Sequence, residues 1–123
     1  MKKFFMLAGL FCFLAMPVLA QEVLEITGTI IDNECLEAHK ADPDFAAYVK
    51  AHTKECALKA GPYSGYSIYT PNNKAYKFDA QSTAQIEDFL KKEDSKLDVV
   101  VEVQQFTDDL TLVSIKNQEE KKE

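Results

Sequence analysis

Four residues able to bind metal or do thiol chemistry occur in a symmetric pattern, Cys35-x3-His39 and His52-x3-Cys56. Two thiolates and two imidazoles suit tetrahedral Zn²⁺, or copper where the geometry is less regular. The spacing differs from the CxxC pairs of common zinc modules. Cys35, His39, His52 and Cys56 therefore form a candidate zinc or copper site, which we hold as the alternative to a protein without a cofactor.

The same two cysteines are a candidate disulfide. Two cysteines in an oxidising compartment most often form one bridge. A bond between Cys35 and Cys56 would close a loop of roughly 20 residues and stabilise the fold by roughly 3 kcal/mol in the chain-entropy model. We take this structural disulfide as the leading interpretation. It excludes the metal site because it consumes both thiolates.

Catalysis by a cysteine has little support in the sequence. There is no CxxC motif, and the charges beside Cys56, on Lys54 and Glu55, cancel, so nothing local favours a thiolate. His52 and Cys56 share a predicted helix face, but no third group that would orient the imidazole is identifiable. We therefore expect no enzymatic activity.

The N-terminus has the pattern of a cleavable signal peptide. Lys2 and Lys3 precede an apolar run over 4–15, and Val18-Leu19-Ala20 places small residues before Gln21. The run is shorter than the ~20 residues that span a bilayer, so we expect no membrane span after cleavage. Residues 1–20 are predicted to direct the chain to the periplasm or to secretion. Their removal takes away two of the 14 lysines and none of the 20 acidic residues, which leaves a net charge of −8.

Hydrophobic periodicity predicts five strands and two helices in the remaining chain. The strands are expected over 23–32, 65–70, 74–78, 97–106 and 110–115, and the helices over 42–61 and 82–92. The first helix would begin at Asp42-Pro43 and end at Gly61-Pro62.

This order, β-α-β-β-α-β-β, favours a mainly β protein with two helices, a five-stranded barrel of the oligonucleotide/oligosaccharide-binding (OB) type. The alternative is an open α+β sheet with both helices on one face. We expect a single domain over 21–116 and a charged flexible tail over 117–123.

Four tyrosines near the predicted hairpin could form a ligand-binding surface: Tyr63, Tyr66, Tyr69 and Tyr76. OB barrels stack bases or sugars on such aromatic side chains. The negative charge and the absence of arginine disfavour nucleic acid. The remaining partners are a small ligand or a protein of the cell envelope. The alternative is that these rings divide between the core and exposed strand positions, as strand propensity alone would give.

Several short motifs resemble a group of small secreted bacterial domains. They are Gly-Thr-Ile-Ile-Asp-Asn-Glu-Cys at 28–35, His52 followed by Glu-Cys-Ala at 55–57, and Phe-Asp at 78–79. The resemblance covers roughly 24–116 and implies an OB-like barrel outside the cytoplasm, in a group whose biochemical role is mostly unassigned. Members often carry a further cysteine where this chain has Ala60, so a three-thiol site is not expected here. The function expected overall is a non-enzymatic binding module with a structural disulfide.

Overall fold

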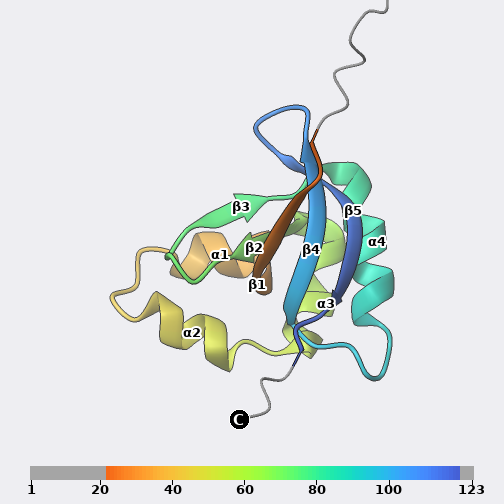
Figure 1. Cartoon of the computed structure of the whole chain (residues 1–123). Coiled ribbons are helices and arrows are strands. Elements are labelled where there is room, and N and C mark those ends of the chain that lie inside the picture. The colour runs from red at the N-terminus through yellow and green to blue at the C-terminus, as the bar shows by residue number, and fades with distance from the viewer. Residues whose placement is uncertain (1–21, 120–123) are drawn as a thin grey trace, which may run out of the picture.

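The longest strand, β1 (Leu24–Asp32), lies at the centre of the sheet, where it pairs with a neighbour on each side. A computed structural model describes residues 22–119 (Figure 1). Its five strands are antiparallel in the order β3-β2-β1-β4-β5. The other strands are β2 (Tyr66–Tyr69), β3 (Ala75–Lys77), β4 (Asp98–Gln105) and β5 (Leu110–Asn117).

The alternation predicted for the fourth strand is confirmed. Val99, Val101 and Val103 are fully buried and belong to the main core. The phase slip predicted in the last strand is also present, because the β4–β5 register shifts between Glu102 and Val103. Val113 is the extra residue on β5, and it is turned toward solvent.

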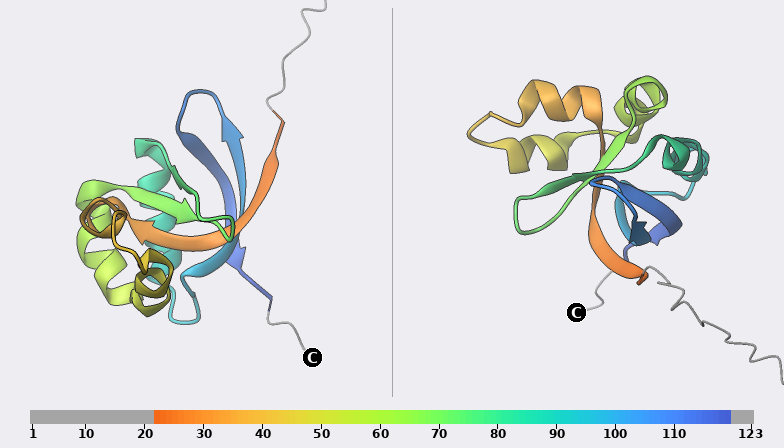
Figure 2. Two further views of the ribbon diagram at one scale, coloured as in Figure 1. Left: turned by 90° about the vertical axis from the view of Figure 1, so that its left-hand side faces the viewer. Right: turned by 90° about the horizontal axis from the view of Figure 1, so that it is seen from above.

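Successive side chains of β1 enter two different hydrophobic clusters. Ile30 joins the main core with residues of α3 (Lys54–Ser64) and α4 (Ala80–Leu90). Ile31 points to the opposite face, where it meets a smaller cluster from α1 (Asn33–His39) and α2 (Phe45–Ala51). Figure 2 shows the two pairs of helices around the C-terminal end of β1. This end of β1, covered on both sides, is where the candidate site lies.

The predicted OB barrel is wrong, because the sheet is open. Within residues 22–119, β3 pairs in a ladder only with β2. The edges approach each other at a single isolated bridge between Phe78 and Leu110. β3 has three residues, all exposed, so it is too short to form the ladder with β5 that closure requires. The open α+β alternative describes the sheet correctly, but with four helices in place of two.

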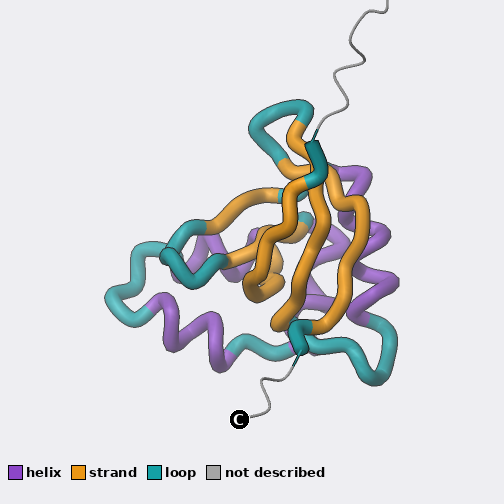
Figure 3. Tube along the Cα trace, viewed as in Figure 1, coloured by secondary structure: helices purple, strands orange, loops and turns teal. Residues whose placement is uncertain are grey.

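The predicted helix over 42–61 is interrupted at His52-Thr53 (Figure 3). Thr53 has extended backbone angles, and its side chain accepts a hydrogen bond from the Cys56 amide, so it caps a new helix. The predicted polar connection before Asp42 contains a third helix, α1, capped by Asp32. The predicted single helix face carrying His52 and Cys56 is therefore wrong.

The helix end predicted at Gly61-Pro62 is also wrong. α3 continues to Ser64 and ends at Gly65, whose φ of 81° is the left-handed conformation that favours glycine. Gly61 has another function, because a Cβ there would overlap the ring of Tyr66. Tyr66 is fully buried, and its hydroxyl donates to the Ala57 carbonyl at 3.0 Å.

Polar side chains join α4 to its neighbours at both ends. Asp79 caps the helix, accepting from the Ser82 amide at 3.0 Å and the Ser82 hydroxyl at 2.7 Å, and it also accepts from Thr111 of β5. The capping box predicted to begin at Ser82 is thus replaced by a cap three residues earlier. At the other end, Lys54 donates to backbone carbonyls after α4 and to the Ser95 hydroxyl. None of the helices within 22–119 is long and apolar enough to cross a bilayer.

Candidate functional site

Asp32 lies at the junction of β1 and α1, and its carboxylate serves both elements. One oxygen, Oδ2, accepts from the Cys35 amide at 2.8 Å and so caps α1. The other, Oδ1, lies 2.9 Å from Nε2 of His52. Asp32 is completely inaccessible to solvent, so this carboxylate depends on protein donors alone for its stabilisation.

His52 reaches Asp32 from the break between α2 and α3. Its side chain is 2% exposed. The other ring nitrogen, Nδ1, is buried and has no hydrogen-bond partner within the described residues. We assign the proton to Nε2, because a proton on Nδ1 would be an unsatisfied buried donor. The lone pair of Nδ1 is then unused among the described residues.

The protonation state of Asp32 follows from its contacts. Burial alone would raise the pKa of Asp32. Hydrogen bonds from His52 and from the backbone and side chain of Cys35 outweigh burial and hold that pKa below its ordinary value. Asp32 is therefore an anion in the neutral pH range. The site contains a fixed negative charge inside the protein.

Cys35 completes the cluster from the first turn of α1. Burial raises the pKa of its thiol, and the nearby Asp32 and Cys56 add to this, whereas the Tyr48 hydroxyl opposes it. The pKa of Tyr48 is raised as well, first by burial and then by Cys35. A nucleophilic cysteine needs a lowered thiol pKa and a base within hydrogen-bond reach. The thiol of Cys35 instead has a raised pKa, and Nδ1 of His52 makes no hydrogen bond to a thiol. The pair therefore lacks both features of a nucleophilic cysteine site.

The cluster does have the composition of a metal site. One ligand atom each of Asp32, Cys35 and His52 can be chosen so that all three lie within 4.8 Å of one another. Carboxylate oxygen, thiolate sulfur and imidazole nitrogen are all zinc ligands. Asp32 and His52 are buried and Cys35 is half-buried, so an ion here would be largely shielded from water.

Two of the four predicted metal ligands are placed elsewhere. His39 lies on the surface side of α1, where Nδ1 pairs with Asp42 at 2.8 Å and the ring stacks on Tyr48 with centroids 3.8 Å apart. Cys56 is exposed in the first turn of α3, near enough to Cys35 to raise the pKa of its thiol, but outside the three-residue group. The structure brings Cys35 and His52 together and joins them to Asp32.

Cys35 and Cys56 are both free thiols in the structure, so their disulfide stays a prediction. The helices that carry them, α1 and α3, are packed against each other. Neither thiol is deeply buried, and Cys56 is open to solvent. An oxidant can therefore reach at least one member of the pair.

The four tyrosines considered as a ligand surface do not share one environment. Tyr66 is in the core, and Tyr63 is 91% exposed at the end of α3. Tyr69 is partly buried, with its ring edge-on to Phe45 at 5.2 Å. Tyr76 is exposed on β3. The arrangement corresponds to the division between core and surface that strand propensity alone would give.

Sequence reasoning missed Asp32 and Tyr48 as members of the site. The signal for Asp32 was its position after an apolar strand and three residues before Cys35, which is the spacing of an N-cap and the amide it binds. Burial of that cap could not be foreseen, since it depends on α2 and α3 closing over it. Tyr48 is one of two aromatic residues on the short helix α2, and the sequence around it carries no comparable signal.

The fold and the site together define an α+β protein with a buried Asp–Cys–His cluster at the end of its central strand. Comparisons of this chain with family models, with curated proteins and with solved structures each find no match. The functional argument is therefore based on the chemistry of the residues themselves.

Proposed function

We propose that this protein binds one divalent transition-metal ion, Zn²⁺ or Cu²⁺, at Asp32, Cys35 and His52. The observation that supports it is the convergence of three ligand atoms of different chemistry within 4.8 Å, at a site that is mostly buried. The ligand set differs from the four residues predicted from spacing, since Asp32 takes the place of His39 and Cys56.

Charge balance favours a divalent ion. A bound thiolate at Cys35 and the carboxylate of Asp32 together carry two negative charges, and a divalent ion neutralises both. Burying a neutral cluster is far less costly than burying separate charges. Without an ion, the Cys35 thiol keeps its proton, as its raised pKa indicates. Metal uptake is therefore expected to release that proton.

Metal binding would require only a small rearrangement of the three side chains. Zinc–ligand bonds of about 2.0–2.3 Å in tetrahedral geometry place ligand atoms about 3.3–3.8 Å apart. The three ligand atoms already lie within 4.8 Å of one another, so only a small rearrangement of the side chains is needed. With His52 as a ligand through Nε2, the ion would take the place of the proton between that nitrogen and Asp32 Oδ1, which lie 2.9 Å apart. Three protein ligands leave a fourth position for water or another ligand.

Metal titration of the reduced, chelator-treated protein tests the proposal. We expect native mass spectrometry to show one ion per chain, and Co²⁺ to give the near-ultraviolet absorption of a cobalt–thiolate bond. Cys35→Ser should abolish that absorption. His52→Ala should weaken binding by more than the about 10–100-fold that loss of an outer-sphere partner costs. Circular dichroism of each variant shows whether it remains folded.

Cys56→Ser and His39→Ala are the matched controls, because each removes a thiol or an imidazole outside the three-residue group. Both should bind the ion as tightly as the parent chain. If these controls lost as much metal affinity as Cys35→Ser and His52→Ala, the ligands would be the four cysteine and histidine residues and not the group that includes Asp32. Equal affinity in the parent chain and in folded His52→Ala would refute a metal site at this cluster.

The competing disulfide is tested by counting thiols. Mature protein, which lacks Cys12 of the predicted signal peptide, is purified without reductant and then unfolded; it should show two reactive thiols if metal is held, and none if Cys35 and Cys56 are bridged. A fully bridged protein from its native compartment would make the metal site irrelevant there, whatever the reduced protein binds.

A further inference from the structure

We propose that a groove between α2 and the β2–β3 hairpin binds a small amphipathic carboxylate. This site is separate from the metal cluster, and the inference goes beyond the proposed function. The groove is lined from α1, α2, β2 and β3 and has a volume of about 600 Å³. That volume lies within the about 300–1,000 Å³ typical of small-molecule pockets.

The groove exists because α2 is held to the rest of the protein at few points. Val49 contributes to the small cluster with Ile31 and Leu36. Phe45, at the start of α2, touches the ring edge of Tyr69. Figure 2 shows α1 and α2 on one side of the protruding β2–β3 hairpin. The groove lies in the space between them, where Ala46 and Ala75 are among the lining residues.

The walls of the groove are apolar where they are deepest. Leu36 is buried, and Phe45 and Tyr69 are partly buried with their rings in contact. A second hollow of about 280 Å³ lies along the same helix and shares Ala46 and Tyr69 with the first. An apolar body of aromatic or branched aliphatic character fits these walls.

The rim of the groove is positively charged, although the chain carries a formal net charge of −6. Three charged side chains line it: Glu37, Lys40 and Lys77. Glu37 is paired with Lys40 at 2.7 Å. Lys77 makes no ion pair within 4 Å among the described residues. The rim therefore carries two cations and one protein carboxylate, and a ligand carboxylate would balance the second cation.

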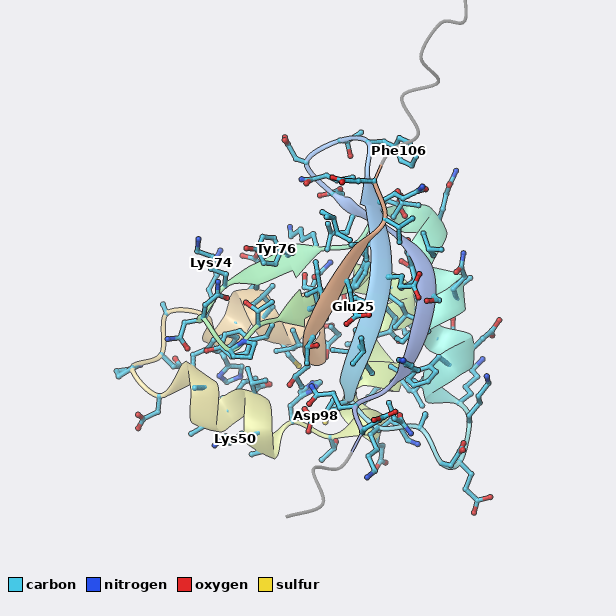
Figure 4. All side chains as sticks on the ribbon, in the orientation of Figure 1. Glu25, Lys50, Lys74, Tyr76, Asp98 and Phe106 are labelled. Carbon is cyan, nitrogen blue, oxygen red and sulfur yellow. The ribbon has the colours of Figure 1, made fainter. Side chains whose placement is uncertain are left out.

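The register of β3 directs Lys77 into the groove. Ala75 and Lys77 both line it, as expected for residues two apart on a strand. Tyr76, between them, extends with Lys74 from the side of β3 away from α2 (Figure 4). The cation and the apolar walls therefore face the same space. An acid with a short apolar chain fits this combination better than a neutral or basic compound does.

The test uses two probes of nearly equal shape, 4-phenylbutyrate and 4-phenylbutan-1-ol, added to ¹⁵N-labelled protein in the presence of a chelator. We expect 4-phenylbutyrate to shift the amide signals of Leu36, Ala46 and Ala75, and to bind more tightly than the alcohol. Lys77→Met should weaken binding of the acid by about two- to fivefold, the range of partly exposed ion pairs, and leave the alcohol unchanged. Lys116→Met is the control, because it removes the same charge from exposed β5.

Ala46→Phe is a second variant, at an exposed helix position where folding should be retained. Its ring would occupy the groove, so both probes should lose binding. Equal affinities for acid and alcohol that Lys77→Met does not change would overturn the carboxylate assignment. Shifts confined to other parts of the molecule, or no shifts at all, would overturn the groove as a site. Because chelator is present throughout, these outcomes are independent of metal binding.

Discussion

Gly61→Ala is a substitution for which local propensity and tertiary packing predict opposite results. Gly61 lies inside α3 with ordinary helical angles. Alanine is about 1 kcal/mol more favourable than glycine in a helix interior, so propensity predicts stabilisation. In the structure, the added Cβ would overlap Cζ, Cε1 and the hydroxyl oxygen of Tyr66. That ring cannot withdraw into solvent, because it is fully buried in the core.

The cost of overpacking exceeds the gain in helix propensity, so the sign of the change in the free energy of unfolding can be predicted. Overpacking a core costs about 1–3 kcal/mol, and occasionally more. Displacing Tyr66 also disturbs its hydrogen bond to Ala57, and an unsatisfied buried hydroxyl costs a further 1–3 kcal/mol or so. After the helix gain of about 1 kcal/mol, we expect a net destabilisation of about 2–4 kcal/mol. For a domain of this size that lowers Tm by on the order of 10–20 °C.

Urea unfolding followed by circular dichroism measures the change. The control is a double-mutant cycle with Tyr66→Leu, whose side chain leaves room for the new methyl group. We expect strong coupling, with Gly61→Ala costing much less when residue 66 is leucine. If Gly61→Ala instead raised the free energy of unfolding by about 1 kcal/mol, as helix propensity requires, the packing of α3 on Tyr66 described here would be refuted.

Two further substitutions test the polar ends of α4. The pKa of Asp79 is lowered because its hydrogen bonds from Thr111 and from the first turn of α4 outweigh the effect of burial. Its stabilisation is therefore complete above the ordinary value of 3.8 and is lost as pH falls through the lower folded value. Asp79→Ala should cost about 2 kcal/mol in urea unfolding at pH 7 and clearly less at pH 3, and an equal cost at both pH values would contradict this. Lys54→Met keeps the aliphatic stem but removes the ammonium group that donates to Ser95 and to the carbonyls after α4. We expect a loss of about 1–3 kcal/mol, against little change for exposed Lys59→Met, and equal thermal stabilities of these two variants would show that the contacts of Lys54 contribute nothing.

Each strand of the described residues was predicted from the sequence, because alternating or aromatic runs bounded by turn residues can be recognised from neighbours along the chain. Periodicity also located the slip in β5, since the apolar phase changes at Val113. The barrel was not predictable in the same way, because closure depends on how far the edge strands extend. β3 is only three residues long, and that length is set by the exposed hairpin and by the cap at Asp79.

The structure brings together two of the four residues considered as metal ligands, and the reason is geometric. Cys35 and His52 were identified by residue type, and the fold brings them together. His39 does not join them, because its ring pairs with Asp42 and stacks on Tyr48. The stacking depends on α1 and α2 lying side by side, which the spacing of the sequence does not show, whereas the pairing with Asp42 is a local contact three residues along the chain.

The sequence by itself determined the inventory of elements and the types of residue available for chemistry. Hydrophobic alternation and short-range capping signals depend on neighbours along the chain, so they can be read without a fold. Only the tertiary structure decided that Asp32 is a buried anion, that His52 lies at a helix break, and that Gly61 makes room for a ring. These features arise where segments far apart in the sequence meet, and burial and unsatisfied polar atoms are defined only there.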